Sequence, residues 1–160
     1  MSVQIRAATS ADVPLVLAFI RELAAYEKLS HEVEATEESL RATLFGEKPA
    51  AECLLAFADD AAKSPAGFAI YFTSYSTFLA KPGLHLEDLF VKSEFRGRGI
   101  GKSILLHLAR LANHRGCGRM EWTVLDWNEP AIAFYESLGA QRMLAWQICR
   151  LTGASLRRYG

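Results

Sequence analysis

The segment from Glu87 to Gly101, EDLFVKSEFRGRGIG, restricts the fold of this chain more than any other. It begins as a strand, continues into a turn that holds three glycines and two arginines, and leads directly into a helical pattern. Glycines let a backbone approach a ligand and turn its N–H groups toward it, and the start of a helix attracts negative charge. The segment therefore predicts a strand–turn–helix unit with an anion site at the turn. Glycine-rich turns before helices also occur without any ligand.

The spacing of this turn and the balance of charge exclude several classes of protein. The turn matches neither GxxxxGK[ST] nor a complete GxGxxG, which disfavours a nucleotide P-loop and a dinucleotide-binding fold. Eighteen basic and eighteen acidic residues cancel, which argues against a dedicated nucleic-acid binder. Residues 1–60 nevertheless carry a net charge of −6, so residues 61–160 carry +6. This asymmetry indicates either scattered solvated charges or an anion site in the second half beside a cation-tolerant first half.

Length and composition indicate one globular domain spanning residues 1–160. The chain has 160 residues, of which 51% are hydrophobic and 22% charged. No apolar run approaches the ~20 residues of a membrane span, and the first residues lack the apolar centre of a signal peptide, so we expect a cytoplasmic protein. The three cysteines lie far apart, which disfavours a disulfide framework and a zinc ribbon; we expect no metal site.

Hydrophobic periodicity predicts an α/β (α+β) fold with a mixed, mostly antiparallel central sheet and helices on both faces. Glycine and proline mark several of the boundaries between elements. The expected strands are residues 3–7, 52–58, 66–78, 84–91 and 119–125, with one or two further strands between residues 142 and 160. The expected helices are residues 13–27, 36–46, 100–114 and 128–139, and a turn is expected at 59–65.

Two motifs in this arrangement resemble a known family. The pattern Arg96-x-x-Gly99-x-Gly101, after a strand that contains Glu87 and Asp88, resembles the acetyl-CoA loop of the GNAT superfamily of N-acetyltransferases. The run WNEPAIAFYESLGA, residues 127–140, is similar to that superfamily's second cofactor motif. Within the superfamily the chain is most like the diamine (spermidine/spermine) N-acetyltransferase group, in the stretches 5–9, 22–27, 86–91 and 127–130. The resemblance covers nearly the whole chain and implies acetyl-CoA as donor, a small amine as acceptor and a homodimer.

The resemblance also implies which positions contact acetyl-CoA. The backbone of a strand would pair with the pantetheine arm, at Leu89, Phe90 and Val91. A loop and the helix start after it would hold the pyrophosphate, at Arg96, Gly97, Arg98, Gly99, Ile100, Gly101 and Lys102. A second helix would border the pantetheine arm, at Asn128, Pro130, Ala131 and Tyr135. Leu89 and Val91 are sheet residues whatever the function, whereas the three glycines have no comparable explanation from core packing.

Catalysis of acetyl transfer requires a proton acceptor and a proton donor. An alkyl amine has a pKa near ~10.4, so only about one molecule in a thousand is neutral near pH 7.4. The family places its proton acceptor, or a substrate carboxylate, at the position of Glu87, and alternation along the strand would turn Asp88 to the opposite face. Tyr135 is the position of the family's acid, which would protonate the departing thiolate of CoA. Alternatively, Glu87 is an ordinary exposed carboxylate and Tyr135 only packs its helix on the sheet.

The acceptor amine is less well defined by the sequence than the donor. Tyr26, Glu27, Glu87 and Trp127 match family positions that contact the amine, although Tyr26 and Glu27 would equally suit an ordinary helix end. The polyamine enzymes carry an acidic residue shortly before the tryptophan that corresponds to Trp146, but this chain has no Asp or Glu after Glu136. We therefore expect a shorter amine, such as a lysine-like amino acid, in preference to spermine. Acetylation of a protein lysine or N-terminus, and a non-catalytic CoA-binding module, remain alternatives.

Overall fold

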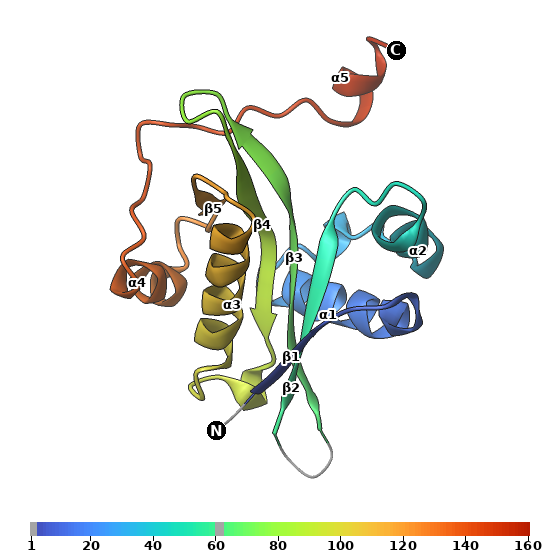
Figure 1. Ribbon diagram of the computed structural model, residues 1–160. Helices are drawn as coiled ribbons and strands as arrows, with labels where there is room; N and C mark the ends of the chain where they lie inside the picture. The colour runs from blue at the N-terminus through green and yellow to red at the C-terminus, as the bar shows by residue number, and fades with distance from the viewer. Residues whose placement is uncertain (1–2, 60–62) are drawn as a thin grey trace. The chain divides into compact units, whose positions relative to one another are not determined.

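A computed structural model of the protein describes residues 3–59 and 63–160. The chain forms two compact units, residues 1–123 and residues 124–160 (Figure 1). The turn expected at 59–65 includes residues 60–62, which lie outside the described residues. Among the described residues, no helix combines the length and apolar character that a membrane crossing needs.

A mixed sheet forms the centre of the first unit. In the described residues it has five strands in the order β1 (Val3–Ala7), β2 (Glu52–Ala58), β3 (Pro65–Ser76), β4 (Lys81–Val91) and β5 (Met120–Trp122). Neighbours from β1 to β4 pair antiparallel, and β5 pairs parallel to β4 because a helical crossover joins them. The predicted mixed, mostly antiparallel sheet is confirmed. The last strand is shorter than the predicted 119–125.

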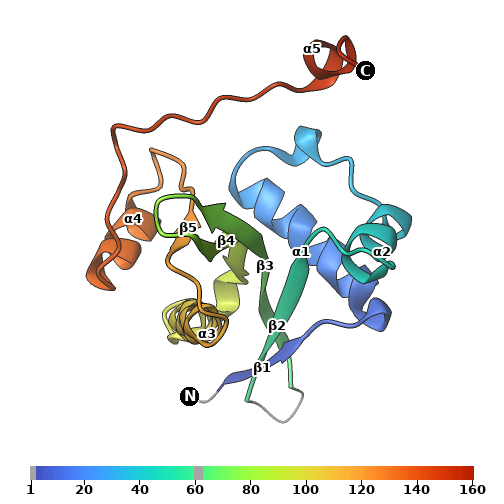
Figure 2. The same cartoon turned by 45° about the horizontal axis from the view of Figure 1, so that its top comes forward.

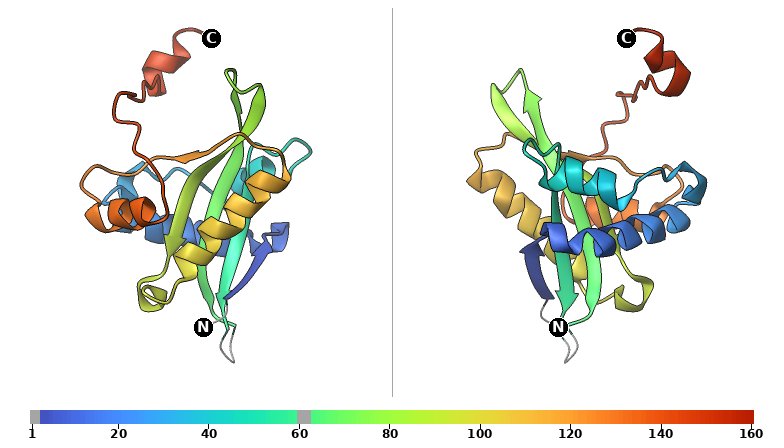
Figure 3. Two further views of the ribbon diagram at one scale, coloured as in Figure 1. Left: turned by 60° about the vertical axis from the view of Figure 1, so that its left-hand side comes forward. Right: turned by 90° about the vertical axis from the view of Figure 1, so that its right-hand side faces the viewer.

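Helices cover both faces of this sheet, as predicted. Helices α1 (Val13–Tyr26) and α2 (Glu37–Phe45) lie on one face and α3 (Ile100–His114) on the other (Figures 2 and 3). Short 3₁₀ turns precede or follow them: η1 (Ser10–Asp12), η2 (Ser30–Glu32) and η3 (Ser93–Phe95). Local sequence explains the ends of α2, because the Thr36 hydroxyl accepts a hydrogen bond from the Ser39 N–H at 3.1 Å and Gly46 follows the last turn.

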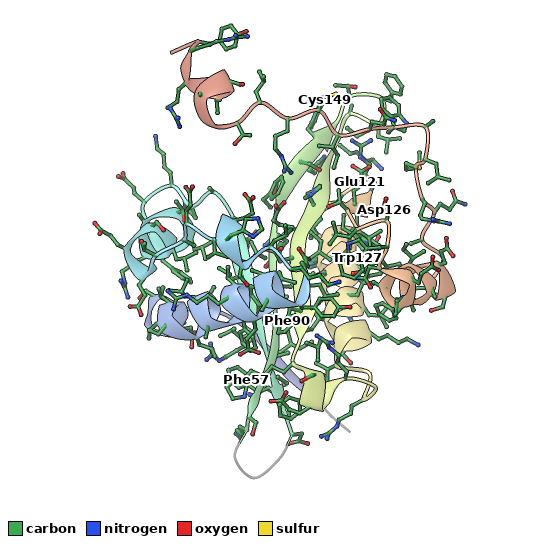
Figure 4. All side chains as sticks on the ribbon, turned by 180° about the vertical axis from the view of Figure 1, so that it is seen from behind. Phe57, Phe90, Glu121, Asp126, Trp127 and Cys149 are labelled. Carbon is green, nitrogen blue, oxygen red and sulfur yellow. The ribbon has the colours of Figure 1, made fainter. Side chains whose placement is uncertain are left out.

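The core between α1 and the sheet is built on three aromatic rings. Phe19 of α1 stacks on Phe68 of β3, with centroids 5.3 Å apart, and meets Phe90 of β4 edge-on at 6.4 Å. Phe19 and Phe68 are fully buried. Figure 4 shows Phe90 at the level of α1, above Phe57 at the far end of β2. This packing fixes the C-terminal half of β4 against α1, where the candidate site lies.

The second unit contains two short helices and a long irregular segment. Helix α4 (Glu129–Ser137) is close to the predicted 128–139, and α5 (Gly153–Arg157) was not predicted. The prediction of strands between residues 142 and 160 is wrong, because no described residue after Trp122 joins the sheet. A strand needs a partner for its backbone groups, and this segment has none in the single chain.

Candidate active site

The loop between β4 and α3 has the backbone geometry that the glycine pattern predicted. Gly97 and Gly99 have φ values of +72° and +77°, a region that L-residues with side chains rarely adopt. A Cβ atom added at either glycine would point into open space. The first N–H groups of α3 lack acceptors within the helix, so the loop and the helix start together present donors to an anion. These residues fit the pyrophosphate of acetyl-CoA.

Arg96 connects this loop to two other elements. Its Nε donates a hydrogen bond of 2.9 Å to the carbonyl of Val91, at the end of β4. Its guanidinium lies over the ring of Tyr26, 4.6 Å from the centroid, and near the ring of Phe90 at 5.5 Å. Arg96 therefore holds the loop against β4 and the end of α1, beyond any charge that it adds to the anion site.

The sheet carries an irregularity at Glu87. Ile70 lies opposite Asp88, and the next residue of β3, Tyr71, lies opposite Leu86, so Glu87 is an extra residue in β4. The bulge interrupts the regular pairing here, and the opposite facing of Glu87 and Asp88 stays a prediction. The Glu87 side chain is 58% exposed, and its Oε2 lies 3.7 Å from His85 Nε2.

Asp88 lines a pocket of about 360 Å³ in the first unit. Glu27, at the end of α1, lines the same pocket, and so do Glu32 and Glu34. The remaining lining residues are mainly aliphatic: Ile20, Leu23, Ala24, Leu29, Val33 and Ala35. A small pocket with acidic groups on apolar walls suits an organic cation.

Burial changes the proton affinity of these carboxylates. Burial, together with the neighbouring charges of Glu87 and Glu27, raises the pKa of Asp88 to about 6. Burial also raises the pKa of Glu27 above its ordinary value. A cation in the pocket would counter both effects by stabilising the ionised forms. Glu27 and Glu87 were predicted as site residues, and the structure brings both close enough to Asp88 for their charges to act on it.

Asp88, Glu32 and Glu34 are pocket residues that the sequence analysis missed. The sequence analysis assumed that one of the two neighbouring carboxylates faces the site and chose Glu87, whereas Asp88 is the one that lines this pocket. Glu32 and Glu34 follow α1 without a motif, and only the net charge of −6 over residues 1–60 indicated an acidic surface. That excess is the one signal in the sequence that pointed toward them.

The second unit carries the other predicted site residues. Asn128 precedes α4, and its side-chain oxygen accepts a hydrogen bond of 3.4 Å from the N–H of Ala131, which explains Asn-Glu-Pro as a helix start. Tyr135 lies on α4 with its ring 5.4 Å from that of Phe134. Trp127, labelled in Figure 4, is about half exposed. That Tyr135 and Trp127 act at the same active site as Glu87 stays a prediction.

Groups of three or more His, Cys, Asp or Glu side chains that could hold a metal ion are absent from residues 3–59 and 63–160. The three cysteines are free thiols; Cys53 is buried and Cys149 exposed.

Comparison with known proteins decides the family. The model of the acetyltransferase (GNAT) family matches residues 18–140. The chain belongs to this family. It is an N-acetyltransferase, and the family's donor is acetyl-CoA.

Two relatives and one solved structure show how far the similarity extends. The thialysine N-epsilon-acetyltransferase of Bos taurus is 42% identical over 97% of this chain and 95% of its own. The L-ornithine N5-acetyltransferase of Arabidopsis thaliana is 34% identical over 96% of this chain and 86% of its own. The structure of an integron cassette protein from the mobile metagenome of V. cholerae matches with a TM-score of 0.80 and 30% identity, over 99% of this chain and 98% of that one.

Proposed function

We propose that this acetyltransferase acetylates the side-chain amine of a lysine-like amino acid, with acetyl-CoA as donor. The observation that carries the proposal is the acidic pocket lined by Asp88 and Glu27. Asp88 directly precedes Leu89–Val91, the segment expected to bind the pantetheine arm. The volume of the pocket suits a short amine better than an extended polyamine. The names of the two relatives, which specify thialysine and ornithine, support the same substrate class.

The donor binds along β4 and the loop that follows. Backbone groups of Leu89, Phe90 and Val91 pair with the pantetheine arm, and the loop from Arg96 to Lys102 holds the pyrophosphate through its N–H groups and the start of α3. The positive φ of Gly97 and Gly99 supports this assignment. The family resemblance assigns Asn128, Pro130, Ala131 and Tyr135 to the same pantetheine arm.

The transfer is direct. The amine nitrogen attacks the acetyl carbonyl carbon, the C–S bond breaks, and the CoA sulfur leaves as a thiolate. Glu87 accepts the proton that the nitrogen loses, directly or through a water, and Tyr135 donates a proton to the sulfur. Glu27 and Asp88 hold the amine's charge before transfer, beside Tyr26 and Trp127. The exposed position of Glu87, beside the pocket residue Asp88 in the sequence, supports this division of roles.

The enzyme in this proposal is a cytoplasmic homodimer. Its acceptor is a small molecule, and neither a nucleic acid nor a membrane is a partner. The exposed apolar residues of the second unit support self-association.

A thiol-release assay with purified protein and acetyl-CoA tests the function. The panel comprises thialysine, lysine, ornithine, spermidine, spermine, an aminoglycoside and a lysine-containing peptide. We expect kcat/KM to be highest for lysine or its thioether analogue and at least ten-fold lower for spermine. Mass spectrometry of the product then locates the acetyl group on the side-chain nitrogen.

Three outcomes contradict the proposal in different ways. A clear preference for spermine would show that the missing carboxylate after Glu136 is replaced elsewhere. Turnover of the peptide alone would indicate a protein acetyltransferase. Binding of acetyl-CoA without turnover of any amine would indicate a CoA-binding module.

A further inference from the structure

His85, on β4 two residues before Glu87, is a titratable side chain that the proposed mechanism does not use. Its Nε2 lies 3.7 Å from Glu87 Oε2. Its ring stacks on that of Phe72 of β3, with centroids 4.7 Å apart and an angle of 27° between the ring planes. The His85 side chain is 26% exposed, against 58% for Glu87. A half-buried ring that is held on an aromatic neighbour therefore lies beside an exposed carboxylate.

The register of the sheet places His85 on the same face as the acidic pocket. Ile70 and Phe72 are two residues apart on β3, so their side chains lie on one face. Asp88 lies opposite Ile70, and His85 lies opposite Phe72. Because directly paired residues share a face, His85 shares a face with Asp88, which lines the pocket. Residues three apart in an unbroken strand would face opposite ways, and the extra residue at Glu87 removes that opposition.

The strands on either side of His85 leave Glu87 as its carboxylate partner. Glu121 of β5, labelled in Figure 4, lies opposite His85 in the parallel ladder. Its Oε1 forms an ion pair with Arg119 Nε at 2.9 Å. On the β3 side the neighbour is the uncharged ring of Phe72. The ion pair of the imidazole is therefore with Glu87, which lies on its own strand.

A carboxylate that accepts a proton from a bound amine has to be held in one position. The side chain of Glu87 is long and exposed, so it needs a partner that restricts its rotation. The His85 ring loses little freedom in this contact, because its stack on Phe72 already orients it. A small rotation of the Glu87 side chain lets an imidazole N–H donate a hydrogen bond to the carboxylate.

We propose that His85 is the positioning residue for Glu87: it holds the Glu87 carboxylate where this group accepts the proton of the amine. The inference rests on the proposed function, since it deepens the role given there to Glu87. His85 does not touch the substrate, so its effect on the rate requires the Glu87 carboxylate. The N–H group of the imidazole carries that effect, and the ring only keeps the N–H in place.

Two substitutions separate the N–H of His85 from its ring. His85→Phe keeps a ring on Phe72 and loses both nitrogens, whereas His85→Gln loses the ring and keeps an N–H donor. The rate constant of a single turnover is measured with saturating acetyl-CoA and the amine of the panel that has the highest kcat/KM. It should fall about ten-fold for the phenylalanine variant and no more than about three-fold for the glutamine variant.

The KM for the amine and the Kd for acetyl-CoA should change little in either variant. His114→Phe alters an exposed histidine at the end of α3 and is the control, which should leave the rate constant unchanged. The reverse order, with the phenylalanine variant more active than the glutamine variant, would show that His85 only packs on Phe72. That result would overturn the proposal.

A double-mutant cycle tests whether His85 acts through Glu87. Glu87→Gln alone should lower the rate constant about 100-fold. His85→Phe in the Glu87→Gln background should lower it by less than about two-fold more, because no base is left to position. Losses that multiply would show an independent role and overturn the inference while the proposed function stands. A wild type that turns over none of the amines would instead overturn the proposed function.

Nuclear magnetic resonance of the four histidines tests the contact without substrate. The His85 signals are identified by their absence from the spectrum of His85→Phe. Glu87→Gln should shift the imidazole signals of His85 and leave those of His107 and His114 in place. Unmoved His85 signals would overturn the inference, whatever the activity of the enzyme.

Discussion

The guanidinium of Arg96 lies over the ring of Tyr26, 4.6 Å from its centroid, and joins the glycine loop to the end of α1. Tyr26 precedes Glu27, which lines the acidic pocket, and Arg96 begins the loop assigned to the pyrophosphate. The contact therefore connects the donor side of the proposed site to the acceptor side. A change on one side is expected to alter binding on the other.

Tyr26→Leu should weaken acetyl-CoA binding although Tyr26 is not assigned to the donor. Loss of the aromatic face removes the support of Arg96, a contact of the order of 1 kcal/mol, so the Kd should rise about three- to ten-fold. Tyr26→Phe keeps the face and should leave the Kd for acetyl-CoA unchanged. Isothermal titration of both variants checks this. Equal Kd values for the leucine variant and the wild type would show that Arg96 needs no such support.

Asp88→Asn should change the pH profile of the enzyme. Because the pKa of Asp88 is raised to about 6, the carboxyl is ionised above that pH and protonated below it. Its attraction for an ammonium group is then present at pH 7.5 and lost as the pH falls through about 6. We expect wild-type kcat/KM to fall across this range. The asparagine variant should have a KM at least ten-fold higher at pH 7.5 and no inflection near pH 6.

The same substitution should stabilise the fold. A carboxyl whose folded pKa lies above its unfolded value destabilises the native state as the pH rises from about 4 to about 6. Asp88→Asn removes that cost, so its free energy of unfolding at pH 7.5 should exceed that of the wild type, by about 1 kcal/mol or more, and the gain should vanish near pH 4. Denaturant unfolding at the two pH values measures it. A lower stability at pH 7.5 would contradict the burial of an ionised Asp88.

The sequence predicted the elements whose causes are local. The bounds of α3, residues 100–114, are as predicted because a glycine turn starts the helix and an apolar stripe continues through it. The same holds for α2, which has Thr36 at one end and Gly46 at the other. Each of these signals acts within a few residues, so it can be read without the tertiary structure.

What the sequence did not predict depends on residues that are distant along the chain. The bulge at Glu87 arises from the pairing of β4 with β3, which places one extra residue in β4. The pocket joins Asp88 to residues 20–35, more than fifty positions away. Residues 144–148 alternate like a strand but do not join the sheet, because backbone pairing requires a partner that no local pattern specifies.

Gly99→Val tests the pyrophosphate loop. Gly99 has a φ of +77°, so valine strains the backbone and projects into the space in front of α3. Acetyl-CoA affinity should fall at least thirty-fold, far more than for Arg98→Ala. Gly116→Val is the matched control, because Gly116 has a similar φ of +71° at the other end of α3. It should lower stability comparably and leave the affinity unchanged. Calorimetry that finds equal affinity for Gly99→Val and the wild type would refute the assignment.

Tyr135→Phe tests the proposed acid. The change keeps the ring and removes one proton donor, so kcat should fall about 100-fold while the Kd for acetyl-CoA changes little. Tyr75→Phe removes the hydroxyl of an exposed tyrosine on β3 and should leave kcat unaltered. Single-turnover measurements ensure that chemistry limits the rate. An unchanged rate would show that water or another group protonates the thiolate.

Arg150→Ala tests how a lysine-like substrate is distinguished from a plain diamine. Cadaverine is the diamine that corresponds to lysine without its carboxylate. The arginines after Glu136 are the cations available to meet it, but Arg142 is bound to Glu136 at 2.8 Å and Arg158 donates to the Tyr159 hydroxyl at 2.6 Å.

Of the two that remain, Arg157 lies in the short helix α5 and Arg150 precedes it, and we choose Arg150 for the test with Arg157 as its control. A charged hydrogen bond of about 1.5–3 kcal/mol corresponds to a loss of roughly ten- to 100-fold in kcat/KM for lysine. The value for cadaverine should not fall, since it has no carboxylate to lose. Arg157→Ala serves as the control of equal charge change and should leave both substrates unaffected. If the two substrates lose activity equally in Arg150→Ala, the arginine acts on the fold or on the donor, and carboxylate recognition must be sought elsewhere.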